Sequence, residues 1–269
     1  MSKSTAEDIV RRAAAAFNAG RTDEARQLCE QGLVRAPREP MLSHLLAAML
    51  YAQRDTATAR FHIENSLHAR PDNAAACLLA GRITRAAGDF EAALSHLDRA
   101  IAIAPQRDVF VEKARTLDQA GLRASAREAW VAILKVIPQH QEAAARLGRL
   151  AWEDGDLAAA AYLERATASD ASAQLWFDLG VVRQDLRDYG PAEAAYRKAL
   201  EIKPDYAEAA LNLGIVLQES GQPDRALAAY ATAYRLRTDM FGSIAMALTS
   251  APHGRLWLDE AELRRALRG

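Results

Sequence analysis

The chain has 269 residues, of which 50% are hydrophobic and 26% are charged, and its formal net charge at pH 7 is -1. This composition can fill a packed core, which excludes a wholly disordered protein, and the near-zero charge argues against a protein built mainly to coat nucleic acid or an acidic membrane. No stretch approaches the roughly 18 consecutive apolar residues that a membrane-spanning helix needs. The segment from Met1 to Asp8 lacks the apolar core of a signal peptide. We therefore expect a cytoplasmic protein that binds neither nucleic acid nor membrane.

Residues 6–140 carry the first sign of a repeat. Proline closes successive segments at intervals of 34, 34 and 33 residues, at Pro37, Pro71, Pro105 and Pro138. A turn is predicted near the middle of each segment, at Gly20, Arg54, Gly88 and Gly121. A fixed period of this size indicates an array of repeated helical units. Four units are predicted, over residues 6–39, 40–73, 74–106 and 107–140.

The fifth predicted unit, residues 141–172, is less regular. It keeps Leu147, Gly148 and the turn glycine Gly155, but it lacks the closing proline. Its second helix is expected to be one residue short, because Ala166 lies 11 rather than 12 residues beyond Gly155.

Residues 173–206 and 207–238 are predicted to be units six and seven, and they show the clearest repetition. Five residue pairs are each 34 positions apart: Leu179 and Leu213, Gly180 and Gly214, Ala192 and Ala226, Tyr196 and Tyr230, and Ala199 and Ala233. Trp176, Leu179 and Val182 share one face of a first helix, in which Gly180 is expected to let another backbone approach closely. Asp188 and Tyr189 are expected to form the turn before the second helix, and Pro204 is expected to end that helix.

This pattern resembles the tetratricopeptide repeat, whose units read Trp-x2-Leu-Gly-x2-Tyr, then Ala-x3-Phe, Ala and Pro. Arg183 departs from it, at a position where the family often has tyrosine. The resemblance implies an all-α fold, a right-handed superhelical solenoid of antiparallel helix pairs over residues 6–238. Consensus packing positions, expected in the core, are held by Trp130, Trp176, Tyr196 and Tyr230. Cys29 and Cys77 stand at apolar positions of different repeats, so buried reduced thiols are expected rather than a disulfide.

Residues 239–269 are predicted to hold a partial repeat and a C-terminal capping helix. A short helix is expected from Met240 to Leu248, followed by a loop from Thr249 to Gly254. Asp259 and Glu262 have the spacing of a capping box for a last helix, Glu260 to Arg268. The exposed face of the last repeat is expected to be covered by Leu256, Trp257, Leu258, Leu263 and Leu267.

The sequence carries no catalytic signature. It has no glycine-rich phosphate loop, no Gly-x-Ser-x-Gly elbow and no His-Glu-x-x-His motif. Its six histidines are scattered, and none is spaced from the two cysteines as metal ligands are. We therefore predict no catalytic residue, no metal site and no cofactor, so that function must come from the surface.

In tetratricopeptide arrays the first helices line a concave groove, and the resemblance implies which positions face it. The predicted groove is apolar at its N-terminal end, arginine-lined in the middle and acidic at its C-terminal end. The candidate partner-binding residues are Leu78, Leu79, Arg82, Arg85, Arg115, Arg146, Arg149, Trp152, Asp178, Asp185 and Asn212. An alternative interpretation stays open, in which these arginines pair with Glu112, Asp118, Glu142 or Glu153 and in which Phe17, Tyr51 and Trp152 pack between helices.

The predicted function is a non-enzymatic scaffold that binds a protein segment in this groove, one with acidic residues and apolar anchors. The lysine positions of the chaperone-tail clamp are absent, and of the asparagine ladder of O-linked N-acetylglucosamine transferases only Asn212 is present. Two alternatives remain at this stage. In the first, the array regulates a bacterial transferase or hydroxylase, in cis or in trans; in the second, it self-assembles into a homo-oligomer through its C-terminal helix.

Overall fold

The computed structural model describes residues 6–168, 172–250 and 260–268. In these ranges every regular element is a helix, and no strand is present. The chain divides into two compact units, residues 1–133 and 134–269, and the boundary falls inside helix α8 (Arg123–Val136). Each unit is therefore described by itself.

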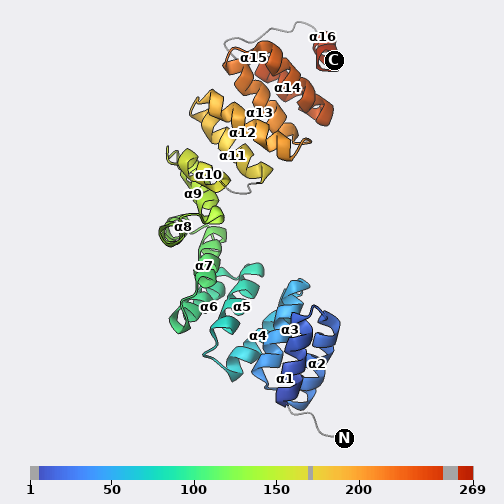
Figure 1. The fold of residues 1–269 in the computed structure, drawn as a ribbon, viewed down its shortest axis with the longest axis vertical. Helices are drawn as coiled ribbons and strands as arrows, with labels where there is room; N and C mark the ends of the chain where they lie inside the picture. The colour runs from blue at the N-terminus through green and yellow to red at the C-terminus, as the bar shows by residue number, and fades with distance from the viewer. Residues whose placement is uncertain (1–5, 169–171, 251–259, 269) are drawn as a thin grey trace. The chain divides into compact units, whose positions relative to one another are not determined.

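The first unit is a run of helix pairs (Figure 1). The two helices of a repeat pack on each other, and the second helix packs on the first helix of the following repeat. First helices also touch in succession, α1 on α3, α3 on α5 and α5 on α7. The helices before α8 are α1 (Ala6–Asn18), α2 (Thr22–Arg35), α3 (Pro40–Ala52), α4 (Thr56–Ala69), α5 (Ala74–Ala86), α6 (Phe90–Ile103) and α7 (Arg107–Gln119).

The second unit continues the same arrangement, with first helices α9, α11, α13 and α15 in contact from one to the next. Its last helix, α16, packs on α14, as expected of a capping helix. The predicted all-α array of helix pairs is thus confirmed. The elements are α9 (Gln141–Glu153), α10 (Ala159–Thr167), α11 (Ala173–Asp185), α12 (Tyr189–Ile202), α13 (Ala207–Glu219), α14 (Pro223–Leu236), the 3-10 helix η1 (Thr238–Met240), α15 (Phe241–Ser250) and α16 (Glu260–Arg268).

A residue with positive φ joins the two helices in each of the seven repeats. In five repeats it is glycine, at Gly20, Gly88, Gly121, Gly155 and Gly221. In the other two it is arginine, since Arg54 has φ 64° and Arg187 has φ 58°. The turn of repeat six therefore differs from the expectation: Arg187 takes the left-handed conformation, and Tyr189 is the first residue of α12.

Glycine in the first helix of a repeat makes room for a large side chain of the second helix. A Cβ added to Gly180 would lie 2.6 Å from the ring of Tyr196, and one added to Gly214 would lie 2.5 Å from the ring of Tyr230. Gly180 was expected to let another backbone approach closely, but what approaches it is the side chain of Tyr196. Trp130, Tyr196 and Tyr230 are fully buried, as the consensus positions predict, whereas Trp176 is only half-buried.

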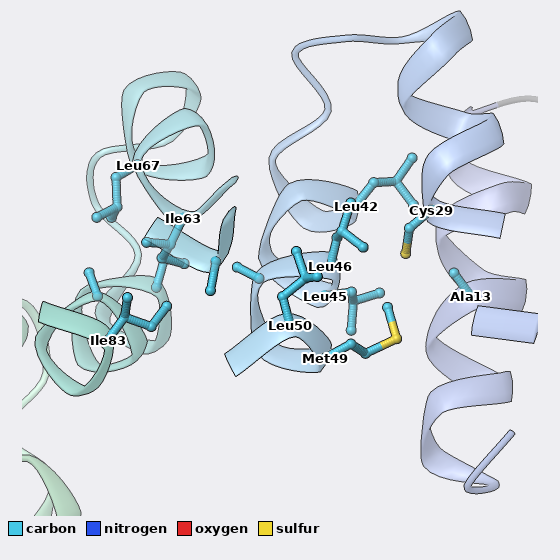
Figure 2. Close-up of a cluster of buried hydrophobic side chains, with 14 of the residues drawn as sticks. Ala13, Cys29, Leu42, Leu45, Leu46, Met49, Leu50, Ile63, Leu67 and Ile83 are labelled. Atoms are coloured by element: carbon cyan, nitrogen blue, oxygen red, sulfur yellow. The ribbon is translucent and has the colours of Figure 1, made fainter. Parts of the chain in front are cut away.

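The core of the first unit is built from small and large side chains that alternate across the helix contacts. Figure 2 shows Leu42 and Met49 on α3 turned toward α1 and α2, where Ala13 and Cys29 lie. Both cysteines, Cys29 and Cys77, are buried and free, as predicted. Burial raises the pKa of the Cys29 thiol to about 11, so this thiol stays protonated at neutral pH.

Two predicted boundaries are wrong. The second helix of repeat five, α10, is much shorter than one missing residue implies: it has 9 residues, whereas α12 has 14. It begins only at Ala159, because Leu157 and Ala158 extend the turn after Gly155. Thr249 was expected in a loop but belongs to α15, which ends at Ser250. Leu256, Trp257, Leu258 and Asp259 lie outside the described residues.

Candidate functional site

The candidate residues of the first unit lie on two neighbouring first helices. Leu78, Leu79, Arg82 and Arg85 belong to α5, and Arg115 belongs to α7. Leu78 and Leu79 are half-buried and pack against the core. Because they precede Arg82 by four and three residues, they lie on the same side of α5 as its guanidinium. We call Leu78, Leu79, Arg82, Arg85 and Arg115 the arginine face.

All three arginines of this face converge on one carboxylate, Glu112 of α7. Its oxygens lie 3.1 Å from Arg82 Nε, 3.2 Å from Arg85 Nη2 and 2.8 Å from Arg115 Nη1. The side chain of Glu112 is only 4% exposed, whereas those of Arg82 and Arg115 are 35% and 36% exposed. The alternative interpretation is therefore correct in part, since the arginines do pair with a nearby glutamate.

Donors outnumber acceptors in this cluster. Arg82 and Arg85 together carry about ten N–H donors, whereas one carboxylate offers about four acceptor positions. Arg85 also donates to Gln119 Oε1 at 3.0 Å, and among the described residues its buried Nε has no hydrogen-bond partner. The Nε of Arg85 is buried, so a ligand could reach only the exposed part of these guanidiniums, chiefly that of Arg82, whose side chain is 35% exposed.

The candidate residues of the second unit form two separate links between α9 and α11. Arg149 Nη2 donates to Asp178 Oδ2 at 3.2 Å, and Trp152 Nε1 donates to Asp185 Oδ2 at 2.8 Å. Arg146 lies on the same helix as Arg149 and is half-buried. Trp152 is 38% exposed, so its ring is also accessible to a ligand.

A polar chain that the sequence does not reveal extends from Asp178. Gln174 Nε2 donates to Asp178 Oδ1 at 2.7 Å, and Tyr206 OH donates to Gln174 Oε1 at 2.8 Å. The ring of Tyr206 also lies 5.0 Å from that of Phe177. Gln174 and Asp178 are four residues apart on α11, as neighbours on one helix face are, but no spacing rule links Tyr206 to them, because it belongs to the turn before α13.

Asn212 faces the interior of its repeat pair. Its Nδ2 donates to Tyr196 OH at 3.3 Å, while that hydroxyl donates to Gln184 Oε1 at 2.8 Å. Burial raises the pKa of Tyr196, so its hydroxyl remains a donor at neutral pH. Asn212 therefore has a structural role in addition to any contact with a ligand.

The expected acidic end carries acids that already have partners. Glu208 Oε1 lies 2.5 Å from Arg237 Nη1, and Glu219 accepts a hydrogen bond from Tyr189 OH at 3.5 Å.

In the first unit Phe17 and Tyr51 are partly buried and pack against the core. These two aromatic side chains are thus packing residues, as the alternative interpretation expected.

Residues 6–168, 172–250 and 260–268 contain neither a metal-binding cluster nor a membrane-spanning helix. These ranges hold no group of three or more histidine, cysteine, aspartate or glutamate side chains arranged to bind a metal ion. They also hold no helix with the length and hydropathy needed to cross a bilayer.

The chain matches three models of the tetratricopeptide repeat. They cover residues 50–110, 111–174 and 172–239, which together span most of the predicted array. No curated protein matches the sequence.

Solved structures of tetratricopeptide type are similar in fold. PilW, a type IV pilus biogenesis factor, matches with a TM-score of 0.65 at 16% identity over 80% of this chain and 100% of its own. PilF of Pseudomonas aeruginosa matches with 0.63 at 15% identity, over 74% of this chain and 92% of its own. MamA of Desulfovibrio magneticus matches with 0.55 at 19% identity, over 62% of this chain and 96% of its own. At such identities the likeness concerns the fold alone. The repeat period, the helix pairs and the three model matches place this chain in the tetratricopeptide repeat family.

Proposed function

We propose that this protein binds a segment of a partner protein on the arginine face. An acidic side chain of the segment would bind Arg82 and Arg85, and an aliphatic or aromatic side chain next to it would pack on Leu78 and Leu79. Tetratricopeptide repeats usually mediate protein–protein interactions and are typically non-catalytic. The proposal is accordingly a non-enzymatic scaffold, working in the cytoplasm.

The observation that carries this proposal is the shared carboxylate. Three arginines meet at Glu112, and Arg82 keeps 35% of its side chain exposed. A guanidinium that is already oriented by one carboxylate loses little conformational freedom when it binds another, which favours bidentate recognition of an acid. The neighbouring leucines supply apolar contact within one helical turn of that charge.

The second unit would make its own, separate contact with a protein segment, through Arg149 and Trp152. Arg149 shares Asp178 with Gln174, and Trp152 is oriented by its hydrogen bond to Asp185. An exposed tryptophan with a fixed ring is a typical anchor of a protein interface. Asp178 and Asp185 then act mainly by orienting these two side chains.

A peptide display library, with random segments of about fifteen residues, tests the proposal. Enriched peptides are expected to combine aspartate or glutamate with leucine or an aromatic residue. Binding of a selected synthetic peptide is then measured by titration calorimetry with the Arg82→Gln variant. We expect a loss of about 10- to 100-fold in affinity, because a hydrogen bond to a charged group contributes about 1.5–3 kcal/mol. Glu112 keeps Arg85 and Arg115, so the fold should persist.

Arg60→Gln is the matched control. Arg60 lies on the second helix α4, is 41% exposed and pairs with two carboxylates, Glu64 and Asp89. Its loss should leave peptide affinity unchanged. Enriched peptides without acidic residues, or equal losses in the two variants, would refute the role of the arginine face.

A further inference from the structure

Three large apolar side chains are exposed where the first helices of repeats five and six end. Trp152 lies near the end of α9, Leu157 lies in the turn that follows α9, and Leu186 follows α11 directly. Leu157 is 75% exposed and Leu186 is 39% exposed. All three residues belong to the second unit. We call them the apolar edge.

Hydrogen bonds link the parts of the apolar edge to one another. The turn folds back on α9, since Gly155 N donates to Trp152 O at 2.9 Å. From the next repeat, Asp185 Oδ2 accepts the indole N–H of Trp152 at 2.8 Å. Trp152 is thus tied both to the turn that carries Leu157 and to the helix end that precedes Leu186.

The late start of α10 explains the exposure of Leu157. Leu157 follows the left-handed Gly155 by two residues, and at the same place in other repeats Phe90 begins α6 and Tyr189 begins α12. Both of those aromatic side chains are half-buried. Because α10 begins only at Ala159, Leu157 stays in the turn, without the packing that its equivalents have. An apolar side chain is therefore accessible to a ligand in repeat five.

Acidic residues surround the apolar edge. Residues 152–157 and 184–188 together contain five acidic residues and one basic residue, Arg187. Arg183, just before the second of these ranges, already pairs with two carboxylates. The five acidic residues are Glu153, Asp154, Asp156, Asp185 and Asp188. The electrostatic potential at the apolar edge is therefore negative.

Two of these carboxylates lie where a helix disfavours negative charge. Glu153 is the last residue of α9, and Asp185 is the last residue of α11. The C-terminal end of a helix carries a partial negative charge, so an acid there is destabilising and a cation is stabilising. The neutral indole of Trp152 orients the carboxylate of Asp185 without cancelling its charge. A cationic group bound from outside would relieve this repulsion.

We propose that the apolar edge binds a basic amphipathic segment of a partner protein. The apolar side chains of the segment pack on Trp152, Leu157 and Leu186, and its lysine or arginine side chains pair with Asp185 and with the acids of the turn after α9. The same charge disfavours nucleic acid and acidic membranes, which are anionic. The inference rests on the contact proposed above for Trp152, whose partner it specifies, and it is independent of the arginine face.

A designed peptide tests the proposal. It consists of about fifteen residues of leucine and lysine only, with leucine at the helical spacing i, i+3, i+4 and i+7, and it carries a fluorescent label. Fluorescence anisotropy measures its binding to the full-length protein, and NMR follows the indole N–H signal of Trp152. We expect binding that shifts this signal. Serine in place of the leucines should weaken binding about tenfold or more, and glutamate in place of the lysines should abolish it.

Two variants of the protein locate the binding site. Leu157→Ser combined with Leu186→Ser should weaken binding of the leucine–lysine peptide about tenfold or more, because both apolar contacts are lost. Asp185→Asn removes one charge but keeps an oxygen that can accept the indole N–H. It should weaken binding about threefold at low salt and less at high salt, because salt screens the interaction.

Leu122→Ser and Asp72→Asn are the matched controls. Leu122 is an exposed leucine in the turn between α7 and α8, and Asp72 is an exposed acid before α5. Both changes should leave the affinity unchanged, and circular dichroism checks that every variant keeps its helix content.

Failure of the leucine–lysine peptide to bind, or equal losses in the control variants, would overturn the proposal. A shift of the Trp152 signal by the glutamate peptide alone would also overturn it, while leaving the contact proposed for Trp152 intact with an acidic partner. If neither peptide shifts that signal, the contact itself is wrong.

Discussion

Tyr196 and Tyr230 hold the same position in repeats six and seven, yet their hydroxyls meet different surroundings. Each donates to a glutamine twelve residues earlier, Gln184 at 2.8 Å and Gln218 at 3.0 Å. Gln184 is half-buried, whereas Gln218 is only 2% exposed and also donates to the carbonyl of Ala247 at 3.2 Å. The tyrosine hydroxyl therefore belongs to a buried hydrogen-bond network in repeat seven and to a partly solvated one in repeat six.

Removing the two hydroxyls should have unequal effects on stability. Tyr230→Phe leaves the Gln218 oxygen buried without a donor, which should lower the free energy of unfolding by about 1–3 kcal/mol. Tyr196→Phe should cost less, about 0.5–1.5 kcal/mol, because water can reach Gln184. Urea unfolding of both variants beside the wild type measures the difference. Equal losses would mean that water also reaches Gln218.

At the scale of the helix pair, the first-helix glycines determine how closely the second helix packs. A Cβ at Gly214 would lie 2.5 Å from the rigid, fully buried ring of Tyr230. Gly190, near the start of α12, has no atom within 4 Å of its virtual Cβ among the described residues. Packing against Tyr230 thus requires glycine at position 214, whereas no such contact requires glycine at position 190.

Gly214→Ala should therefore destabilise the protein, despite the better helix propensity of alanine. Overpacking of a tight core site costs about 1–3 kcal/mol, which exceeds the gain of up to about 1 kcal/mol from replacing glycine in a helix. Gly190→Ala meets no such contact and should be neutral or stabilising. The midpoints of urea unfolding of both variants test this. A stable Gly214→Ala protein would show that α13 and α14 can move apart at no cost.

At the scale of the whole molecule, three histidines with depressed pKa values lie in one unit. Burial lowers the pKa of His44, His62 and His96 below the ordinary value of 6.5, although Glu30 and Glu64 partly oppose the shift at His62 and His96. All three belong to residues 1–133. The folded first unit therefore binds fewer protons near pH 6 than its unfolded chain does.

Acid should destabilise the first unit through these histidines. A depressed folded pKa contributes stability that is complete above about pH 6.5 and is lost as pH falls below it. Hydrogen exchange, corrected for its intrinsic pH dependence, should show the opening free energy of α3 to α6 falling between pH 7 and pH 5. Combining His44→Gln, His62→Gln and His96→Gln should flatten that slope, whatever the absolute stability of the variant. An unchanged slope would assign the acid sensitivity to carboxylates instead.

The sequence by itself determined the helix pairs, their period and most of their turns. Such features depend on residues within about 34 positions of each other. Gly88, Pro105 and Ala192, for example, each determine the structure of the chain close to them. It also identified the candidate side chains of the first helices, because equivalent positions of successive repeats are expected to face the same side of the array. The sequence predicted a second helix of repeat five that is one residue short, but no residue of the pattern marked the late start of α10 at Ala159.

Only the tertiary structure decided which of these side chains meet. Glu112 gathers arginines from two helices, and Asp178 and Asp185 bind Arg149 and Trp152 of the preceding first helix. The sequence predicted that the last helix covers the last repeat, but only the structure showed that it packs on α14. A repeat period determines where helices begin and end, but hydrogen bonds between repeats depend on distances of about 3 Å that only the stacking of the helices establishes.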